Sequence, residues 1–487
     1  MMIKSKNDKS LNGLLSELKG KKIVIWGLGL NFGGLEATKF FAKIKKAQIL
    51  ILDTKRQEEL EESLKKLQKY KNISFLLGRE QREEDFEGAS LIIKNPAIPW
   101  ENPLVKILQK KGFRIETDIS LFFRFFQGQI IGITGSKGKT TTTVLIGELL
   151  KSDERDVLLG GNIRISLFSF LQNKILKDSK KIAVLELSSF QLEDLAKVKR
   201  SPNVAVVTNI LRDHLNRYGN YEKYIQAKKN ISCFQTRKDF LVLNQDDKHW
   251  NSFAQGKGQK IYFSLKKIKQ NEGFLLEKSQ IYKVESAKRK PFLNLIGLNE
   301  EIFLKINNQK NLLASLAVAD KVFKINREKI KKTLKKFPGV PLRLEKVAIK
   351  KGIVFYNDTT ATMPDATIGA LESFKNQKIV LISGGADKNL KFEKMAKTIA
   401  KKVKEAILLP GSATPKIKLA LDKYAPNLKY KEVTTLDRAV KLAYKKARPR
   451  GIVLLSPGCA SFGLFKNEFD RGEQFNGIVK MLCAELK

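Results

Sequence analysis

The sequence is poor in the side chains that form cross-links or bind soft metals: among 487 residues it has three cysteines and two histidines. Cys233, Cys459 and Cys483 show neither paired nor metal-ligand spacing, which indicates reduced, unpaired thiols. The sequence also lacks any run of about 18 apolar residues, so no transmembrane helix is expected. Its first ten residues, MMIKSKNDKS, have no apolar signal core, and we expect a cytoplasmic protein without a membrane partner.

Acidic residues are scarce relative to basic ones, with 50 Asp and Glu against 92 Lys and Arg and a formal net charge of +42. A field of this sign attracts polyanions, so a nucleic-acid-binding protein is one hypothesis. The lysines are, however, spread along the whole chain, and arginine, which is better suited to bidentate phosphate and base contacts, is much scarcer. Solvated lysine faces are therefore favoured, and no nucleic-acid partner is expected.

Length and composition predict a large folded protein. A chain of 487 residues corresponds to about three domains, and a hydrophobic content of 42% is enough to form buried cores. Apolar strand segments alternate with helical patterns throughout, which predicts an α/β fold with domains at 1–127, 128–339 and 340–487. The last boundary lies in the Pro/Gly-rich segment FPGVP. Four aromatic residues before the second domain are expected in core or interdomain packing: Phe122, Phe123, Phe125 and Phe126.

The most informative stretch is IGITGSKGKTTTT, residues 131–143. An apolar strand runs into a glycine-rich turn, and a helical pattern follows, so backbone N–H groups and the helix N-terminus can hold an anion. The strict Walker A pattern is not met, because Ile133 stands where its first glycine would be. Lys139 can still reach the outer phosphates, and the Thr140 hydroxyl can hold Mg²⁺. The turn therefore predicts nucleotide binding at Gly135, Gly138, Lys139, Thr140 and Thr141.

A second glycine turn ends the first strand of the chain, in KKIVIWGLGLNFGG. Its Gly27-x-Gly29 is followed by Gly33-Gly34, so the spacing does not match a strict dinucleotide fingerprint. The next strand ends at Asp53. This turn alone is weak evidence for a ligand.

Polar residues follow several strands of the middle and last thirds. Glu186 ends the strand IAVLEL, and Asp213 and His214 follow NVAVVTNI. Because ligands of parallel α/β sheets bind at the carboxyl ends of strands, Glu186 and His214 are expected to share a metal–phosphate region beside the phosphate loop. In the last third, the strand ends NDTT, SGGADK and SPGCAS favour a second ligand surface.

The ordered set TGSKGKTTT, LELSSFQLE, NILRDHLNRY, YIQAK, FPGVPLRLE, NDTTAT, SGGADK and SPGCASFGLFKNEFDRG resembles the Mur ligases of peptidoglycan synthesis. The resemblance covers nearly the whole chain. It implies an N-terminal Rossmann-like uridine-nucleotide domain, a central P-loop ATPase-type domain with a mostly parallel sheet, and a C-terminal Rossmann-like domain. Within the family the sequence looks most like the members that add D-glutamate to UDP-N-acetylmuramoyl-L-alanine through an acyl phosphate.

The resemblance implies a monomer that uses ATP and two Mg²⁺ ions. Catalytic roles fall on Lys139, His214 and Lys228. Lys228 matches a lysine that the family carbamylates, and a carbamate anion is an oxygen ligand suited to Mg²⁺. The implied metal ligands are Thr140, Glu186, His214 and Lys228. The implied further ATP contacts are Asn308, Asn311, Arg343 and Asp358.

The resemblance also assigns two substrate pockets. The positions that match contacts to the UDP-linked acceptor are Leu30, Asn31, Thr54, Lys55, Asn162, Ser188 and Gln191. Those that match the pocket for the incoming glutamate are Thr362, Lys388 and Ser461.

Several residues depart from the family pattern. Asn307 and Leu342 stand where histidine is usual, and KNPAIP replaces a usual Ser-Pro-Gly, although Asn95 could still serve there. Thr360 replaces a common lysine, and Glu468 precedes a phenylalanine that commonly comes first. The last two lie near the expected glutamate pocket, so a ligase for L-glutamate or another amino acid remains an alternative. A folate-type ligase, a nucleic-acid-dependent P-loop ATPase and a pure binding module are weaker ones.

Overall fold

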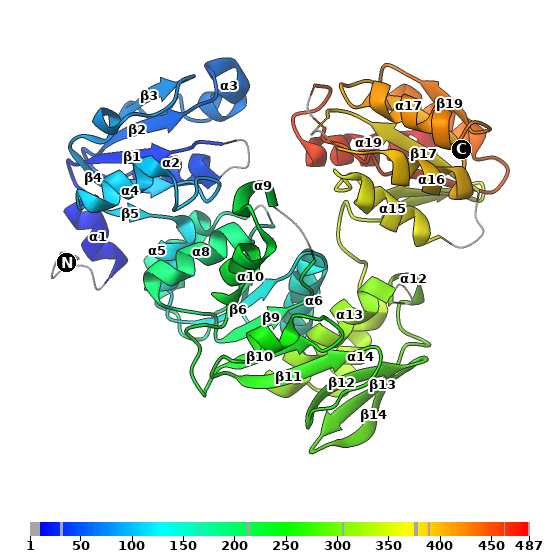
Figure 1. Ribbon diagram of the computed structural model, residues 1–487, viewed down its shortest axis with the longest axis horizontal. Coiled ribbons are helices and arrows are strands. Elements are labelled where there is room, and N and C mark those ends of the chain that lie inside the picture. The colour runs from blue at the N-terminus through cyan, green and yellow to red at the C-terminus, as the bar shows by residue number, and fades with distance from the viewer. Residues whose placement is uncertain are drawn as a thin grey trace. The chain divides into compact units, whose positions relative to one another are not determined.

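The computed structural model describes residues 10–29, 33–163, 165–211, 215–303, 306–374, 378–387, 390–461 and 463–485 (Figure 1). The chain divides into two compact units, Met1–Phe337 and Pro338–Lys487. The first unit contains a five-stranded and a nine-stranded sheet, and the second contains a six-stranded sheet. The α/β class and the parallel sheets expected from the sequence are confirmed.

The N-terminal sheet is wholly parallel, in the order β3-β2-β1-β4-β5. Its strands are β1 (Lys22–Trp26), β2 (Gln48–Asp53), β3 (Ile73–Leu77), β4 (Ala89–Lys94) and β5 (Ile115–Glu116). The helical segments around them are α1 (Leu11–Glu17), α2 (Gly33–Phe41), α3 (Gln57–Lys65), η1 (Glu83–Phe86), α4 (Pro103–Lys110) and α5 (Asp118–Phe125). In β1, Ile23 and Ile25 enter one core, whereas Val24 and Trp26 enter the other. Both faces are therefore covered, which explains the unbroken apolar run of this strand.

The central sheet has the order β14-β13-β12-β11-β10-β9-β6-β8-β7. It is parallel from β7 through β12, and β12, β13 and β14 are antiparallel. Its strands are β6 (Gln129–Thr134), β7 (Val157–Gly161), β8 (Ile182–Glu186), β9 (Val204–Val207), β10 (Phe240–Asn244), β11 (Gln259–Ser264), β12 (Glu272–Glu277), β13 (Gln280–Glu285) and β14 (Lys288–Asn294).

Helices cover both faces of this sheet. They and the shorter helical segments of the region are α6 (Lys139–Ser152), η2 (Leu167–Phe170), α7 (Asn173–Leu176), α8 (Ser189–Val198), α9 (Leu215–Tyr218), α10 (Tyr221–Lys229), α11 (Trp250–Phe253), α12 (Glu300–Phe303), α13 (Ile306–Leu316), the π-helical η3 (Ala317–Val322) and α14 (Arg327–Lys336).

One hydrophobic core joins the two sheets of the first unit. It contains residues of the N-terminal sheet, such as Ile25, and residues of the central one, such as Leu185. The four phenylalanines of FFRFF lie in this core, as expected: Phe122, Phe123, Phe125 and Phe126. Helix α5, which carries most of them, packs against α8 of the central region. The two sheets are therefore held together by hydrophobic packing as well as by the covalent connection between them.

The second unit has one sheet in the order β15-β16-β20-β17-β18-β19, in which only the β15–β16 pair is antiparallel among the described pairs. Its strands are β15 (Glu345–Lys350), β16 (Ile353–Asn357), β17 (Ile379–Gly384), β18 (Val403–Leu409), β19 (Lys429–Glu432) and β20 (Ile452–Leu455). Its helices are α15 (Pro364–Glu372), α16 (Glu393–Lys402), α17 (Thr414–Tyr424), α18 (Leu436–Lys446) and α19 (Glu468–Glu485). Two cores, one on each face of the sheet, again account for the apolar strands.

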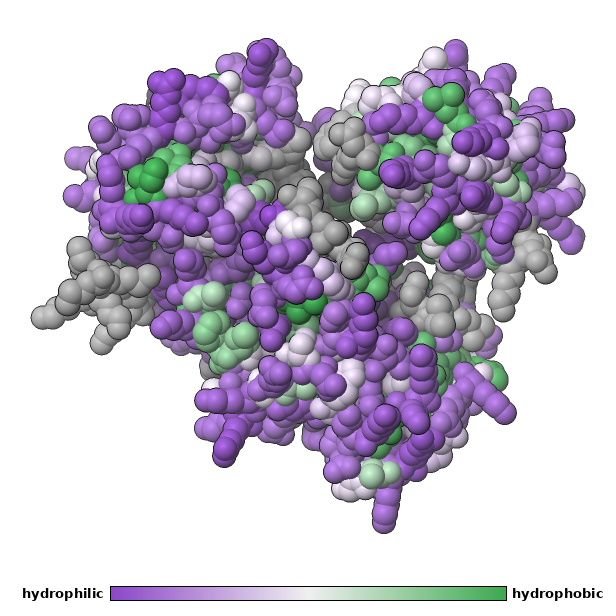
Figure 2. All heavy atoms as spheres, in the orientation of Figure 1, coloured by the Kyte–Doolittle hydropathy of each residue, from purple (hydrophilic) through white to green (hydrophobic). Residues whose placement is uncertain are grey.

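The surface in view is mostly hydrophilic, with hydrophobic residues scattered over it (Figure 2). Many lysines pair locally with acidic residues one helical turn away, as Lys65 does with Glu61 and Lys66 with Glu62. Such exposed pairs contribute little to stability. In the part of the chain that the structure describes, no helix is long and apolar enough to cross a membrane.

Candidate active site

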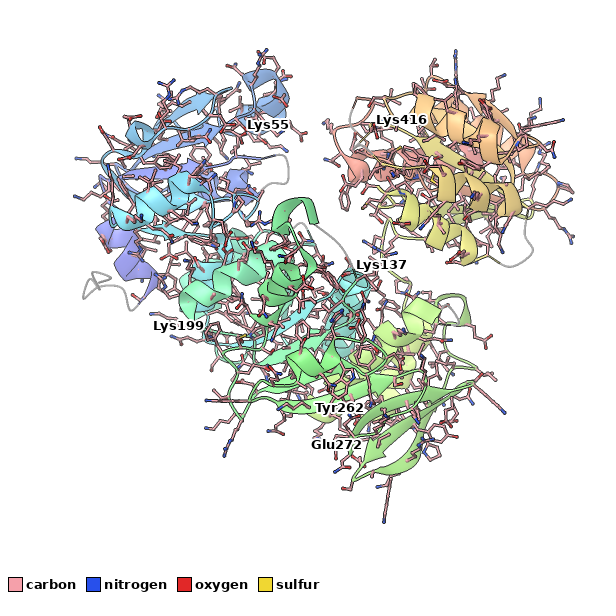
Figure 3. All side chains as sticks on the ribbon, viewed as in Figure 1. Lys55, Lys137, Lys199, Tyr262, Glu272 and Lys416 are labelled. Carbon is pink, nitrogen blue, oxygen red and sulfur yellow. The ribbon has the colours of Figure 1, made fainter. Side chains whose placement is uncertain are left out.

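The phosphate loop lies between β6 and α6, as the sequence predicts, and Lys137 of this loop is labelled in Figure 3. Lys139, the first residue of α6, directs its Nζ back over the turn, 3.0 Å from the Gly135 carbonyl and 3.2 Å from that of Ser136. Asn209, just after β9, holds the turn from the other side: its backbone carbonyl accepts from Ser136 N, and its side chain accepts from Lys137 N. The loop is thus held in shape by the strand next to it.

Two glycines of the loop occupy positions where any other residue would be strained. Gly135 and Gly138 have φ angles of +148° and +86°. A Cβ atom on Gly135 would lie 1.9 Å from Thr208 Oγ1, and one on Gly138 would lie 2.3 Å from Asn311 Oδ1. Both the left-handed backbone and the close neighbours therefore require glycine.

Thr140 and Glu186 form an oxygen-rich pair at the start of α6. Thr140 Oγ1 lies 2.6 Å from Glu186 Oε2, and Asn162 Nδ2 donates to the other carboxylate oxygen at 2.9 Å. Glu186 is buried at the carboxyl end of β8. A hydroxyl and a carboxylate beside a phosphate loop are the donor set that Mg²⁺ prefers, so the residues present fit this ion.

Lys228, in the last turn of α10, is buried beneath the same loop. Its Nζ donates to Thr134 Oγ1 and to the Gly135 carbonyl, each at 3.1 Å. The Nζ also lies 5.0 Å from the ring centroid of Tyr224, whose hydroxyl is 2.8 Å from Ser136 Oγ. Lys139 and Lys228 therefore both donate to the Gly135 carbonyl. This buried position distinguishes Lys228 from the many solvated lysines of the chain.

The two asparagines expected beside ATP lie on α13. Asn311 is buried and packs against Gly138, and its Nδ2 is 3.4 Å from Asn308 Oδ1. Asn308 in turn donates to the Ile302 carbonyl. The structure therefore places Asn311 against the phosphate loop, although Gly138 and Asn311 are far apart along the chain.

The glycine turn after β1 is organised by Asp53, at the end of β2. Its Oδ2 accepts from Gly29 N and its Oδ1 from Lys55 N, both at 3.0 Å. Asn95, after β4, packs on the turn from the other side, because a Cβ on Gly27 would lie 2.8 Å from the Asn95 Cβ. Lys55, labelled in Figure 3, and the exposed Thr54 directly follow Asp53 at the end of β2. The Asp53 carboxylate is thus engaged by the backbone.

Ser188 and Gln191 cap the start of α8 reciprocally. Ser188 Oγ accepts from Gln191 N, and Gln191 Oε1 accepts from Ser188 N. This capping box supplies a structural reason for two residues that the resemblance assigns to the acceptor. Both remain at the carboxyl end of β8, next to Glu186.

A buried acid lies farther along α8. Asp194 Oδ1 accepts from Trp100 Nε1 at 2.8 Å, and its Oδ2 accepts from Thr117 Oγ1 at 2.9 Å. Desolvation raises the pKa of Asp194 to about 7, against the opposing effect of Lys94. Desolvation also raises the pKa of Asp118 to about 6 and lowers the pKa of the Lys94 ammonium. Sequence patterns did not predict this group, because its partners Trp100 and Thr117 are far from Asp194 along the chain.

In the second unit, Asp358 follows β16 and is buried. Its carboxylate accepts from Leu344 N and from Ser456 Oγ. Thr359, the residue after Asp358, is held by the fully buried Arg471. The Arg471 guanidinium donates to the hydroxyl and to the carbonyl of Thr359. Desolvation lowers the pKa of Arg471 to about 10.

The other expected residues of this unit lie at the same carboxyl edge of the sheet. Ser461 is buried, and its Oγ has no hydrogen-bond partner among the described atoms. Thr362 is half-buried after the Asp358 turn. Arg343 lies in the turn before β15. Four residues predicted from the sequence lie outside the described residues: Leu30, Asn31, His214 and Lys388.

Comparison with known proteins supports one family. The Mur ligase middle domain matches residues 133–319, and the Mur ligase glutamate ligase domain matches residues 342–459. A UDP-N-acetylmuramoylalanine–D-glutamate ligase of Roseiflexus sp. (strain RS-1) is 37% identical over 473 residues, which cover 95% of this chain and 99% of that protein. The chain belongs to the Mur ligase family. Ligases of this family use ATP and Mg²⁺, in agreement with the phosphate loop and the Thr140–Glu186 pair.

Other Mur ligases agree in sequence and fold. The similarly named protein of Clostridioides difficile (strain 630) is 35% identical over 471 residues, covering 96% of this chain and 100% of that protein. Among solved structures, UDP-N-acetylmuramate–alanine ligase of Thermotoga maritima has a TM-score of 0.57 at 20% identity, covering 94% of this chain and 99% of that one. MurF ligase of T. maritima, in complex with ADP, has a TM-score of 0.55 at 16% identity and covers 99% and 100%. These two likenesses show the fold.

Gly138→Ala tests the close packing of the loop. The added methyl group meets Asn311 and forces a left-handed backbone on a residue with a Cβ, so we expect ATP affinity to fall by at least ~10-fold with a loss of roughly 1 kcal/mol or more in stability. Titration calorimetry with an ATP analogue measures the first and denaturant unfolding the second. Gly297→Ala is the control, because Gly297 has a φ of +83° but open space around it. Equal ATP affinity in both variants would contradict the role of Asn311.

Asp194 predicts a pH dependence of stability. Its folded pKa of about 7 is above the ordinary value of 3.8, so the neutral carboxyl stabilises the fold below about pH 4, and this contribution is lost as pH rises through about 7. Asp194→Asn cannot ionise, and we expect its unfolding midpoint to fall less than that of the wild type between about pH 5 and about pH 8. A residual slope is expected from Asp118. Thermal unfolding at several pH values measures this, with the exposed Glu222→Gln as control; an unchanged slope in Asp194→Asn would refute it.

Proposed function

We propose that this protein is an ATP-dependent ligase that adds D-glutamate to UDP-N-acetylmuramoyl-L-alanine. The observation that carries the proposal is the near-full-length similarity to proteins named for this reaction, at 34–37% identity. The phosphate loop with Lys139, Thr140 and Glu186 supports the ATP-dependent step. We expect a cytoplasmic monomer that binds neither nucleic acid nor membrane.

The chemistry explains why a phosphate loop is needed. A carboxylate is a poor electrophile, so its oxygen first attacks the γ-phosphorus of ATP, giving an acyl phosphate and ADP. The deprotonated amine of glutamate then attacks the carbonyl carbon, and phosphate leaves as the amide forms. Lys139 and the N–H groups at the start of α6 stabilise the charge on the transferred phosphoryl group. In this assignment Asn308 and Asn311 contact the adenine side, and Arg343 and Asp358 are also ATP contacts.

Magnesium would be held by Thr140 and Glu186, with His214 and Lys228 as ligands of a second ion. When bound, it would neutralise phosphate charge during transfer. Asn162 supports the first position, since it fixes one oxygen of Glu186 and leaves the other toward Thr140. Both hydrogen bonds orient the carboxylate before any ion binds.

Lys228 is proposed to carry a carbamate. As an amine it donates to Thr134 Oγ1 and the Gly135 carbonyl. Addition of CO₂ to the neutral amine, with loss of one proton, would place an anionic oxygen pair in this buried position. An anion beside the phosphates is tolerable only next to a cation, so carbamate and second metal support one another.

The two ends of the UDP-linked acceptor and the incoming glutamate are assigned to three separate sets of residues. The turn after β1, with Leu30 and Asn31, and the residues after β2, Thr54 and Lys55, would hold the uridine diphosphate. Asn162, Ser188 and Gln191 would contact the muramoyl-alanine part. Thr362, Lys388 and Ser461 would hold the incoming glutamate. The Oγ of Ser461, which has no hydrogen-bond partner among the described residues, is a donor suited to a carboxylate.

A ligase for L-glutamate or another amino acid is the second candidate, motivated by Thr360 and Glu468. Glu468 lies in the first turn of α19, and its carbonyl accepts from the hydroxyl of Thr359, so this helix start is fixed to the Asp358 turn. An acidic side chain there repels a substrate carboxylate where other family members present an aromatic ring, and Thr360 offers no cation in place of the common lysine. These two changes therefore bear on which amino acid is bound, and the charge argument alone does not distinguish D- from L-glutamate.

The decisive measurement is phosphate release from ATP with UDP-N-acetylmuramoyl-L-alanine and either D-glutamate, L-glutamate or no amino acid. We expect release that depends on D-glutamate, and Lys139→Ala should lower turnover at least ~10²-fold because it removes charge stabilisation. Release that depends on L-glutamate would move the protein to the second candidate. Release that depends on neither amino acid but rises with added RNA or DNA, with a steep salt slope, would refute both ligase functions.

The carbamate is tested by a pair of neighbouring lysines. Lys228→Ala should abolish ligation, and added CO₂ should not restore it, whereas Lys229→Ala should remain active. With ¹³C-labelled bicarbonate, a carbamate carbon resonance should be present in the wild type and in Lys229→Ala and absent in Lys228→Ala. Equal activity of the two variants, or a signal that persists without Lys228, would remove the proposal.

A further inference from the structure

Helix α8 connects the central sheet to the N-terminal one. It begins beside Ser188, at the carboxyl end of β8, and its later turns present Glu193, Asp194 and Lys197 to the other sheet. There it meets residues 94–100, the segment that follows the carboxyl end of β4. We call Glu193, Asp194 and Lys197 the α8 clamp.

The first part of the clamp holds Trp100. The indole donates to Asp194 at 2.8 Å, and the ring centroid lies 4.7 Å from Lys197 Nζ and 4.5 Å from Lys94 Nζ. Asp194 and Lys94 are almost completely inaccessible, at 0% and 1% exposure, and Trp100 is at 8%. The indole is therefore fixed both by one directed hydrogen bond and by two cations near its ring.

The second part holds the middle of the same segment. Arg217, on α9, donates to Glu193 at 2.9 Å and to the Ala97 carbonyl at 2.7 Å. Ala97 N donates to Asn95 Oδ1, and Asn95 packs on the glycine turn after β1. Contacts thus run without a gap from α8 to the turn assigned to uridine diphosphate.

We propose that the α8 clamp is a positioning device for the UDP-linked acceptor, with Asp194 as its central positioning residue. This inference rests on the proposed function, in which the turn after β1 and the start of α8 hold opposite ends of one substrate. The helix is a rigid spacer between the two, so the clamp sets the distance at which both ends can be held together. None of its residues needs to touch the substrate.

A purely stabilising contact would not need this chemistry. A buried carboxylate loses its hydration, and well-packed apolar residues often hold an interface as stably or more so. Hydrogen bonds to an indole and to a backbone carbonyl add direction, which apolar packing does not. A misplacement of reacting groups by about 1 Å can lower a reaction rate about 10²-fold. An acceptor held at both ends therefore requires contacts with a fixed direction.

The test separates one-ended from two-ended binding. Affinities for UDP alone and for UDP-N-acetylmuramoyl-L-alanine are measured by calorimetry on the full-length wild type, Asp194→Ala, Asp194→Asn and Trp100→Phe. We expect Asp194→Ala and Trp100→Phe to weaken the complete acceptor about 10-fold, equivalent to about 1.4 kcal/mol, while UDP and ATP affinities change less than about 2-fold. Asp194→Asn keeps an acceptor for the indole and should bind the complete acceptor nearly as the wild type does.

The control for lost stability is Gln235→Leu. Gln235 is a buried side chain that donates to the Pro202 and Phe240 carbonyls, inside the central region. The inference is wrong if Gln235→Leu lowers the affinity for the complete acceptor as much as Asp194→Ala does. It is also wrong if Asp194→Ala and Trp100→Phe lower the affinities for UDP and for the complete acceptor equally, or if they change neither affinity. A wild type that binds neither UDP compound would instead refute the proposed function, which keeps the two failures distinct.

Discussion

The site depends on one steric constraint: a polypeptide turn must pass between Thr208 and Asn311 with no side chain on its inner face. Gly135 and Gly138 meet this constraint, and a Cβ at either point would force a neighbouring side chain to move. Because the turn is narrow, its backbone N–H groups can face an anion and its Gly135 carbonyl can accept from two lysines. The positions of Lys139 and Lys228 therefore follow from the glycines as much as from their own helices.

Parallel strand order explains why residues far apart in the sequence meet at this turn. Strands β8, β6 and β9 are neighbours, so Glu186, the phosphate loop and Asn209 reach one edge of the sheet. Buried on both faces, these strands have little freedom to shift, and their last residues are fixed accordingly. Polar groups at such an edge are well oriented and yet open to a ligand. The same rule gathers Asp358 and Ser456 in the second unit, where β16 pairs with β20.

Sequence patterns predicted what depends on local order. The strand–turn–helix of the phosphate loop, the parallel sheets and the burial of the FFRFF segment required only neighbouring residues and their periodicity. The antiparallel β12–β14 extension was not predicted, and neither was the junction around Asp194. From the sequence, an aspartate in the middle of a helix is expected to be solvated. Asp194 is buried only because the fold places Trp100 and Thr117, which are 94 and 77 residues away along the chain, against it. Ser188 and Gln191 lie in a recognisable motif, but that motif has two explanations. The two side chains form a capping box, and they are also proposed to contact the substrate; the sequence alone could not separate these roles.

The large positive charge has a different meaning at the surface and in the site. Exposed lysines pair with nearby acids or are hydrated, and their mutual repulsion is screened within about 8 Å at physiological salt. Lys94 and Lys228 are instead buried, and each is held by oxygen atoms: the Asn95 and Ile98 carbonyls in the first case, Thr134 and Gly135 in the second. Loss of hydration at these buried positions costs free energy, which the hydrogen bonds to specific oxygen atoms offset. The roles of Lys94 and Lys228 therefore depend on their positions and not only on their charge. Net charge is therefore a poor guide to function in this chain, and the burial of individual charges is a better one.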